Sequence, residues 1–90
     1  MTNASNKLIS LPTKFGPVSV SPETFDVASA VCGRNGRTIA GVMEADIERV
    51  QGGLDVEKLR EECCEGTDPG SDEEAGWSDW VDAVEAMANA

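Results

Sequence analysis

Histidine and tyrosine are both absent from the 90-residue sequence. Histidine is the commonest general acid or base, the usual partner of a nucleophilic cysteine and a frequent metal ligand. The carboxylate pairs that remain are more typical of a solvated acidic face than of a catalytic dyad. We therefore expect a protein that is not an enzyme, with no catalytic residue, no cofactor and no metal site.

Cysteine is scarce as well, and its three positions, Cys32, Cys63 and Cys64, cannot form a complete set of disulfides. Adjacent helical positions point about 100° apart, so Cys63 and Cys64 are badly placed to bind one ion. The glutamates that flank this pair should raise the pKa of both thiols and suppress the reactive thiolate. We expect Cys32 and Cys63 to be small core residues and Cys64 to have no special role.

The sequence has no apolar run long enough for a signal or membrane segment, because residues 1–14 are interrupted by Asn, Ser, Lys and Pro. Together with the unpaired cysteines, this pattern favours the reducing cytoplasm and no membrane partner.

Basic residues are missing from the last third of the sequence. Residues 1–60 hold all seven Lys and Arg and seven of the seventeen Asp and Glu, so the other ten acids lie in residues 61–90 without a base. We expect a single domain over residues 1–90, with a frayed N-terminus (1–6), a charge-balanced body (7–60) and an acidic C-terminal segment (61–90) that contains an amphipathic helix. Such a split is typical of a charged binding surface.

The residues that are present predict a mainly α fold with a short N-terminal β-hairpin, a small α+β domain. Residues 7–11 and 15–20 are short β-branched or apolar runs, which predict the two strands. Ser21, Pro22 and Glu23 favour a helix start, and Gly33 favours its end, so the first helix is expected at about residues 22–32. A turn over residues 33–36 should follow it.

The segment from residue 38 to 50 fits both a helical and an alternating strand pattern, and its composition favours a helix at about 40–51. Asp55 then caps a further helix that ends at Gly66. In the last segment Gly76 should interrupt or delay the helix, which we expect from Ser78 onward. There Trp77 and Trp80 belong to an apolar stripe, and we expect them to dock the helix onto the body.

Two other patterns in the sequence bear on function. Asp68, Asp72, Glu73 and Glu74 lack the alternating spacing of a calcium loop, so we expect no calcium site. The first two predicted helices and their turn resemble a helix-turn-helix, in which Arg34, Arg37 and Thr38 would face a groove of DNA. Because the body lacks a positive stripe, direct nucleic-acid binding is not expected, and a helix-turn-helix regulator is kept as an alternative.

The acidic segment supplies the candidate binding residues. Asp79, Asp82 and Glu85 recur at every third position, so a helix would space them by about 4.5 Å along its axis, which is of the order of the charge spacing in a nucleic-acid strand. Such a surface could occupy a basic groove that normally holds DNA or RNA. The predicted partner-binding residues are Asp72, Glu73, Glu74, Asp79, Asp82 and Glu85.

Small size, acidity, the lack of catalytic residues and a segregated acidic end make this sequence similar to small phage or mobile-element inhibitors, including anti-CRISPR and DNA-mimic proteins. This likeness is one of composition. It implies an inhibitor or adaptor that binds a basic surface on a nucleic-acid-handling protein, in the host-cell cytoplasm if a phage encodes it. A second alternative is a virion or complex assembly protein, whose last helix would pack between copies in a homo-oligomer.

Overall fold

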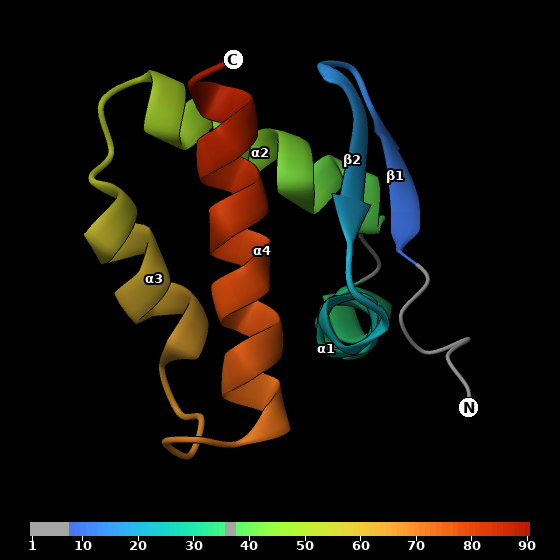
Figure 1. The fold of residues 1–90 in the computed structure, drawn as a ribbon, viewed down its shortest axis with the longest axis vertical. Helices are drawn as coiled ribbons and strands as arrows, with labels where there is room; N and C mark the ends of the chain where they lie inside the picture. The colour runs from blue at the N-terminus through green and yellow to red at the C-terminus, as the bar shows by residue number, and fades with distance from the viewer. Residues whose placement is uncertain (1–7, 36–37) are drawn as a thin grey trace.

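The structure, a computed structural model, describes residues 8–35 and 38–90 of the chain. In this part of the chain a hairpin is followed by four helices: β1 (Ile9–Thr13), β2 (Gly16–Val20), α1 (Pro22–Asn35), α2 (Ile39–Gln51), α3 (Val56–Cys64) and α4 (Asp72–Ala88). Figure 1 shows α4 in the middle, α3 on one side of it, α1 and the hairpin on the other, and α2 crossing behind. The predicted mainly helical domain with an N-terminal hairpin is confirmed.

The hairpin alternates as its sequence predicts. β1 and β2 pair antiparallel with Leu11 opposite Val18, and both side chains are buried. The strand limits differ from the prediction, because Pro12 and Thr13 belong to β1 and Phe15 lies in the turn. The turn forms beside Gly16, whose φ of +114° suits glycine far better than other residues.

Helix α1 starts as predicted and ends later than predicted. The backbone N–H of Thr24 donates to Ser21 Oγ over 3.2 Å, which is an N-cap contact. Gly33 does not end the helix, which continues to Asn35. A glycine inside a helix costs only about 1 kcal/mol relative to alanine, so it is a weak stop signal. Of the predicted turn, residues 33–35 are therefore helical, and Gly36 lies outside the described residues, as do Arg37 and residues 1–6.

The ambiguous segment is helical. Thr38 caps α2, since its side chain accepts a hydrogen bond from the Gly41 N–H over 3.1 Å. Asp55 caps α3 as predicted, and its Oδ1 accepts from the Glu57 N–H over 2.9 Å. The Asp55 cap is a contact between near neighbours in the chain, which explains why the sequence pattern was enough to place it. The cap at Thr38 was not predicted.

Helix α4 runs without a break from Asp72 to Ala88, so the prediction that Gly76 delays it is wrong. The glycine serves a different purpose, because α1 crosses α4 at this point. A Cβ at position 76 would lie 3.1 Å from the Glu23 carbonyl oxygen and 3.1 Å from Val27 Cγ2. The glycine therefore lets the two helix backbones approach each other closely.

The core lies around α4. Trp80, Val81 and Val84 are fully buried and pack with buried residues of α2, α3 and the hairpin, among them Met43, Ile47, Leu59 and Val20. Trp77 is half-buried and meets Trp80 edge to face, with ring centroids 5.7 Å apart. The predicted docking of α4 through its tryptophans is confirmed.

None of the described helices combines the length and the apolar character that a membrane crossing requires.

Candidate functional site

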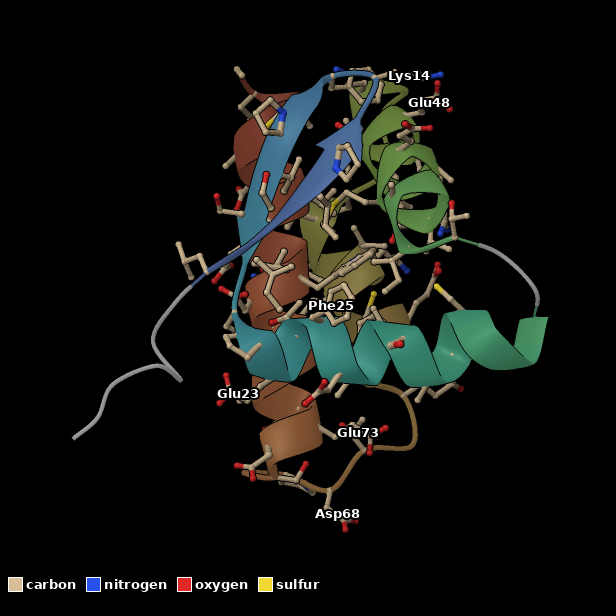
Figure 2. The ribbon with its side chains drawn as sticks, turned by 90° about the vertical axis from the view of Figure 1, so that its right-hand side faces the viewer. Lys14, Glu23, Phe25, Glu48, Asp68 and Glu73 are labelled. Carbon is tan, nitrogen blue, oxygen red and sulfur yellow. The ribbon has the colours of Figure 1, made fainter. Side chains whose placement is uncertain are left out.

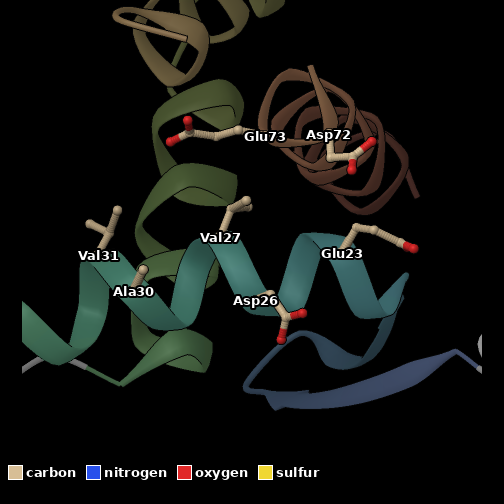
Figure 3. Close-up of a pocket in the computed structure, with 7 residues that line it drawn as sticks. All are labelled: Glu23, Asp26, Val27, Ala30, Val31, Asp72 and Glu73. Carbon is tan, nitrogen blue, oxygen red and sulfur yellow. The ribbon is translucent and has the colours of Figure 1, made fainter. Parts of the chain in front are cut away.

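The candidate site is an open groove of about 360 Å³ between α1 and the first turn of α4 (Figure 3). Apolar side chains of α1 and carboxylates of both helices line it: Val27, Ala30 and Val31 with Glu23, Asp26, Asp72 and Glu73. None of these seven lining residues is basic. We call this feature the acidic groove.

The sequence of α1 places these groups on one side of the helix. Glu23, Val27 and Val31 follow one another at intervals of four residues, which is the spacing of neighbours on one helix face. The close approach at Gly76 then sets α4 against this face. The walls of the acidic groove are therefore fixed by helix packing rather than by a loop.

The first turns of both helices carry the acids. Glu23 lies in the first turn of α1, and Asp72 and Glu73 lie in the first turn of α4. Acids are favoured there because the helix dipole places partial positive charge at the N-terminus. The helix dipole thus explains why each helix has acids in its first turn. It does not explain why the first turns of α1 and α4 lie at the same groove.

The carboxylates surround the apolar floor unevenly. Figure 3 shows the Glu73 side chain reaching from α4 over the space above Val27 and Val31, with Glu23 and Asp72 at one end of the groove. Asp26, which also lines the groove, is drawn below the α1 ribbon in this view. At physiological salt the field of such charges acts over about 8 Å, so the opening attracts cationic groups.

The wider charge distribution is also uneven. Figure 2 places Glu23, Glu73 and Asp68 at one end of the molecule and Lys14 with Glu48 at the opposite end. Lys14 is paired there with Glu48, a contact that raises the pKa of the lysine. The charge of Lys14 is thus partly neutralised. The acidic groove lies at the opposite end of the molecule, with Glu23, Glu73 and Asp68.

Asp79, one of the predicted binding residues, has a structural role. Its Oδ2 accepts hydrogen bonds from the Ser21 N–H over 3.1 Å and from the Thr24 hydroxyl over 2.8 Å. Thr24 is fully buried and also lies 2.9 Å from the carbonyl oxygen of Gly76. Asp79 therefore fixes the start of α1 against α4 and holds one wall of the acidic groove in place.

The other predicted residues are divided between caps and open surface. Glu74 Oε1 accepts from the Gly70 N–H over 2.8 Å at the start of α4. Asp82 pairs with Arg60 of α3 over 3.0 Å and keeps 66% of its side chain exposed, and Glu85 is exposed one turn further along α4. The structure thus brings Asp72 and Glu73 together at the acidic groove and leaves the other four outside it.

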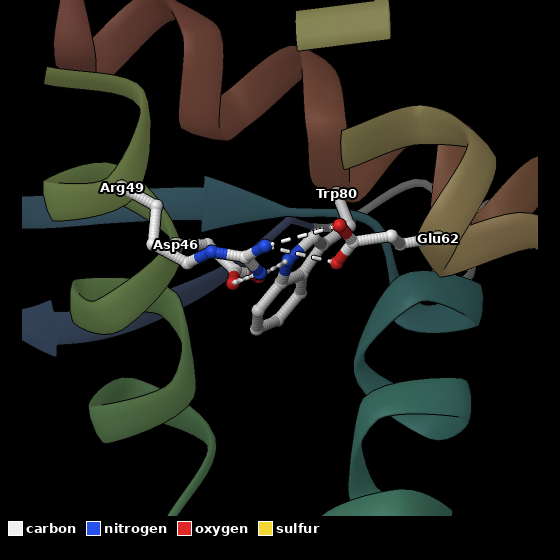
Figure 4. Close-up of polar contacts among 4 residues, drawn as sticks. All are labelled: Asp46, Arg49, Glu62 and Trp80. Atoms are coloured by element: carbon white, nitrogen blue, oxygen red, sulfur yellow. Dashed lines mark hydrogen bonds and ion pairs between the residues drawn. The ribbon is translucent and has the colours of Figure 1, made fainter. Parts of the chain in front are cut away.

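The division of charge along the sequence is not a division in space. Arg49 of the balanced body binds Glu62 of the acidic segment through contacts of 3.0 and 3.1 Å (Figure 4), and Arg60 binds Asp82. Glu62 and Asp82 of the acidic segment are therefore paired with bases of the body. Charge counting along the chain also missed Glu23, whose four-residue spacing from Val27 was the available signal.

The cysteines occupy the predicted environments. Cys32 is buried, and Cys63 is half-buried and packs against the core. Burial, followed by the charge of Asp46, raises the pKa of the Cys63 thiol to about 12. Burial also raises the pKa of Cys64. Both thiols therefore have a raised pKa, as expected, but the main cause is burial rather than the flanking glutamates.

Two further expectations concern contact with DNA and the binding of a metal ion. Thr38, a candidate DNA-facing residue, caps α2, while the side chain of Arg34 and the whole of Arg37 lie outside the described parts of the chain. Within residues 8–35 and 38–90, no three His, Cys, Asp or Glu side chains gather closely enough to hold a metal ion.

Comparisons with known protein families, with curated proteins and with solved structures find no match to this chain.

Proposed function

We propose that the protein is a small non-enzymatic inhibitor or adaptor that binds a basic surface on a nucleic-acid-handling protein. The observation that carries this proposal is the acidic groove, where carboxylates from two helices meet and no lining residue is basic. We place the centre of the binding surface at Glu23, Asp72 and Glu73. Asp82 and Glu85 extend the acidic surface along α4, and Asp79 keeps its structural role.

The partner is argued from charge complementarity. Proteins that hold nucleic acids present Arg and Lys side chains to phosphates, and this electrostatic attraction supplies much of their affinity. Carboxylates on a fixed framework can occupy the same cationic positions. A protein that binds in this way excludes the nucleic acid, as do the phage-encoded DNA mimics that the composition resembles.

The framework supports this role because it is ordered before binding. The acids of the groove belong to α1 and α4. The hydrogen bonds from Ser21 and Thr24 to Asp79 hold these two helices together. A preorganised surface loses less conformational entropy on association, so more of the electrostatic attraction appears as affinity. Complementary charge also speeds the encounter of the two proteins.

A competition experiment tests the proposal. The full chain is used to capture its partner from the native host lysate, and the purified partner is loaded with labelled nucleic acid. We expect the chain to displace the nucleic acid at equilibrium, with an affinity that falls as salt is raised. Glu73→Lys should weaken displacement by tenfold or more, corresponding to about 1.4 kcal/mol, whereas Glu61→Lys on α3 should leave it nearly unchanged.

The proposal is contradicted if chain and nucleic acid bind the captured partner together. It is contradicted equally if Glu73→Lys and Glu61→Lys have the same effect, because binding would then follow net charge rather than the acidic groove.

A further inference from the structure

The floor of the acidic groove is apolar, although it opens to solvent. Val27 and Val31 are half-buried and Ala30 is exposed, and all three line the opening beneath the carboxylates. Apolar surface that stays in contact with water gains free energy when another apolar group covers it. The groove is therefore suited to an occupant that has both an apolar part and a positive charge.

Different kinds of occupant fit this combination unequally. A phosphate or nucleic acid would be repelled by Glu23, Asp72 and Glu73, and a purely apolar group would desolvate these carboxylates without pairing them. An arginine or lysine side chain matches both parts, because it carries a charged head on a stem of three or four methylenes. Its head can form charge-assisted hydrogen bonds with carboxylates.

We propose that the acidic groove takes up one long cationic side chain of a protein partner, an arginine or a lysine. The stem lies along Val27, Ala30 and Val31, and the head lies beneath Glu73, which reaches over this face (Figure 3). The inference rests on the proposed function and specifies it further, since it names the element of the basic partner that the groove recognises.

The stem contact separates this proposal from attraction by charge alone. Capped peptides of equal charge carry 2,4-diaminobutyrate, ornithine or lysine, which differ only in having two, three or four methylenes. Their affinities for the isotope-labelled full chain are measured by NMR titration at low salt. A fully buried methylene contributes roughly a fourfold gain in affinity, so we expect at least a fourfold rise from the shortest to the longest side chain.

Two variants locate the stem contact. Val31→Thr keeps the shape of the side chain but adds a hydroxyl to the floor, so the dependence on stem length should flatten while the shortest peptide binds as before. Val56→Thr makes the same change at a half-buried position of α3 outside the groove and should leave the dependence intact. An arginine peptide should bind at least as well as the lysine peptide, and its uncharged analogue with citrulline should not bind.

The results separate the two proposals. Affinities that do not change with stem length in the unaltered protein, but fall in Glu73→Lys, overturn the stem contact and leave the acidic surface as the binding site. Affinities that respond neither to stem length nor to Glu73→Lys contradict both the stem contact and the proposed function.

Discussion

The indole Nε1–H of Trp80 donates a hydrogen bond to Asp46 Oδ2 over 2.9 Å, and this contact joins α4 to α2 inside the protein (Figure 4). Arg49 lies 3.8 Å from the same carboxylate and continues to Glu62 on α3. The Asp46–Arg49 pair of α2 thereby contacts both α4 and α3. The arrangement gives Trp80 a polar role in addition to its place at the centre of the core.

Replacing Trp80 by phenylalanine should destabilise the protein by about 2–4 kcal/mol, because the change leaves a cavity and removes a donor from a carboxylate that is only 13% exposed. Urea unfolding measures the effect. The matched change Trp77→Phe, at a half-buried position, should cost clearly less. Equal losses would show that the contact with Asp46 adds nothing to stability.

Gly76→Ala should destabilise the protein even though alanine is the better helix former. Helix propensity favours alanine by about 1 kcal/mol, but the added Cβ would meet the Glu23 carbonyl oxygen at 3.1 Å and force α1 away from α4. We expect a net loss of about 1–2 kcal/mol in thermal or urea unfolding. The reverse change at the neighbouring exposed position, Ala75→Gly, should show the propensity cost alone. A stabilised Gly76→Ala variant would contradict the close approach of the helices.

Removal of the Asp79 carboxylate should destabilise the protein more than removal of the Asp72 carboxylate. Asp79→Ala takes the acceptor from the Ser21 N–H and the Thr24 hydroxyl, so it should cost about 1–3 kcal/mol, whereas the exposed Asp72→Ala should cost less than about 1 kcal/mol. Combining Asp79→Ala with Thr24→Val should be non-additive by at least about 0.5 kcal/mol in a double-mutant cycle. Additive costs would mean that the two side chains act independently.

Alkaline pH should weaken the fold through Cys63. Its pKa is raised from 9.0 to about 12 in the folded protein, so the unfolded chain releases the proton first. The stability tied to this thiol is therefore complete below pH 9 and is lost as the pH rises toward 12. Urea midpoints at pH 7.5 and pH 10 should fall more in the unaltered protein than in Cys63→Ala. An equal fall in both proteins would exclude this thiol as the cause.

The sequence predicted those features that depend on neighbours along the chain. The caps at Ser21 and Asp55 and the alternation in the hairpin are local, and all three are present. The predictions that Gly33 ends α1 and that Gly76 interrupts or delays α4 are wrong because a glycine's local preference is weak beside the packing of its helix. At Gly76 the deciding partners are Glu23 and Val27 of α1, which lie far from it in the chain.

The candidate site was predicted only in part, for a related reason. Asp72 and Glu73 were identified from the excess of acids near the C-terminus, and they do line the acidic groove. The sequence places Glu23 in the charge-balanced body, although helix packing brings it to the same opening. The sequence predicts Asp79 as a binding residue on the surface, because nothing in the last segment shows that its hydrogen-bond donors come from residues 21 and 24.

The most direct test of the acidic groove compares two double charge reversals that alter the net charge equally. Glu23→Lys with Glu73→Lys changes both walls of the groove, and Glu57→Lys with Glu61→Lys changes exposed positions of α3. The dissociation constant of the captured partner should rise about a hundredfold in the first variant, as expected for two lost charge contacts of about 1.4 kcal/mol each, and by less than about threefold in the second. Equal losses of affinity, with both variants folded, would contradict the groove as the binding site.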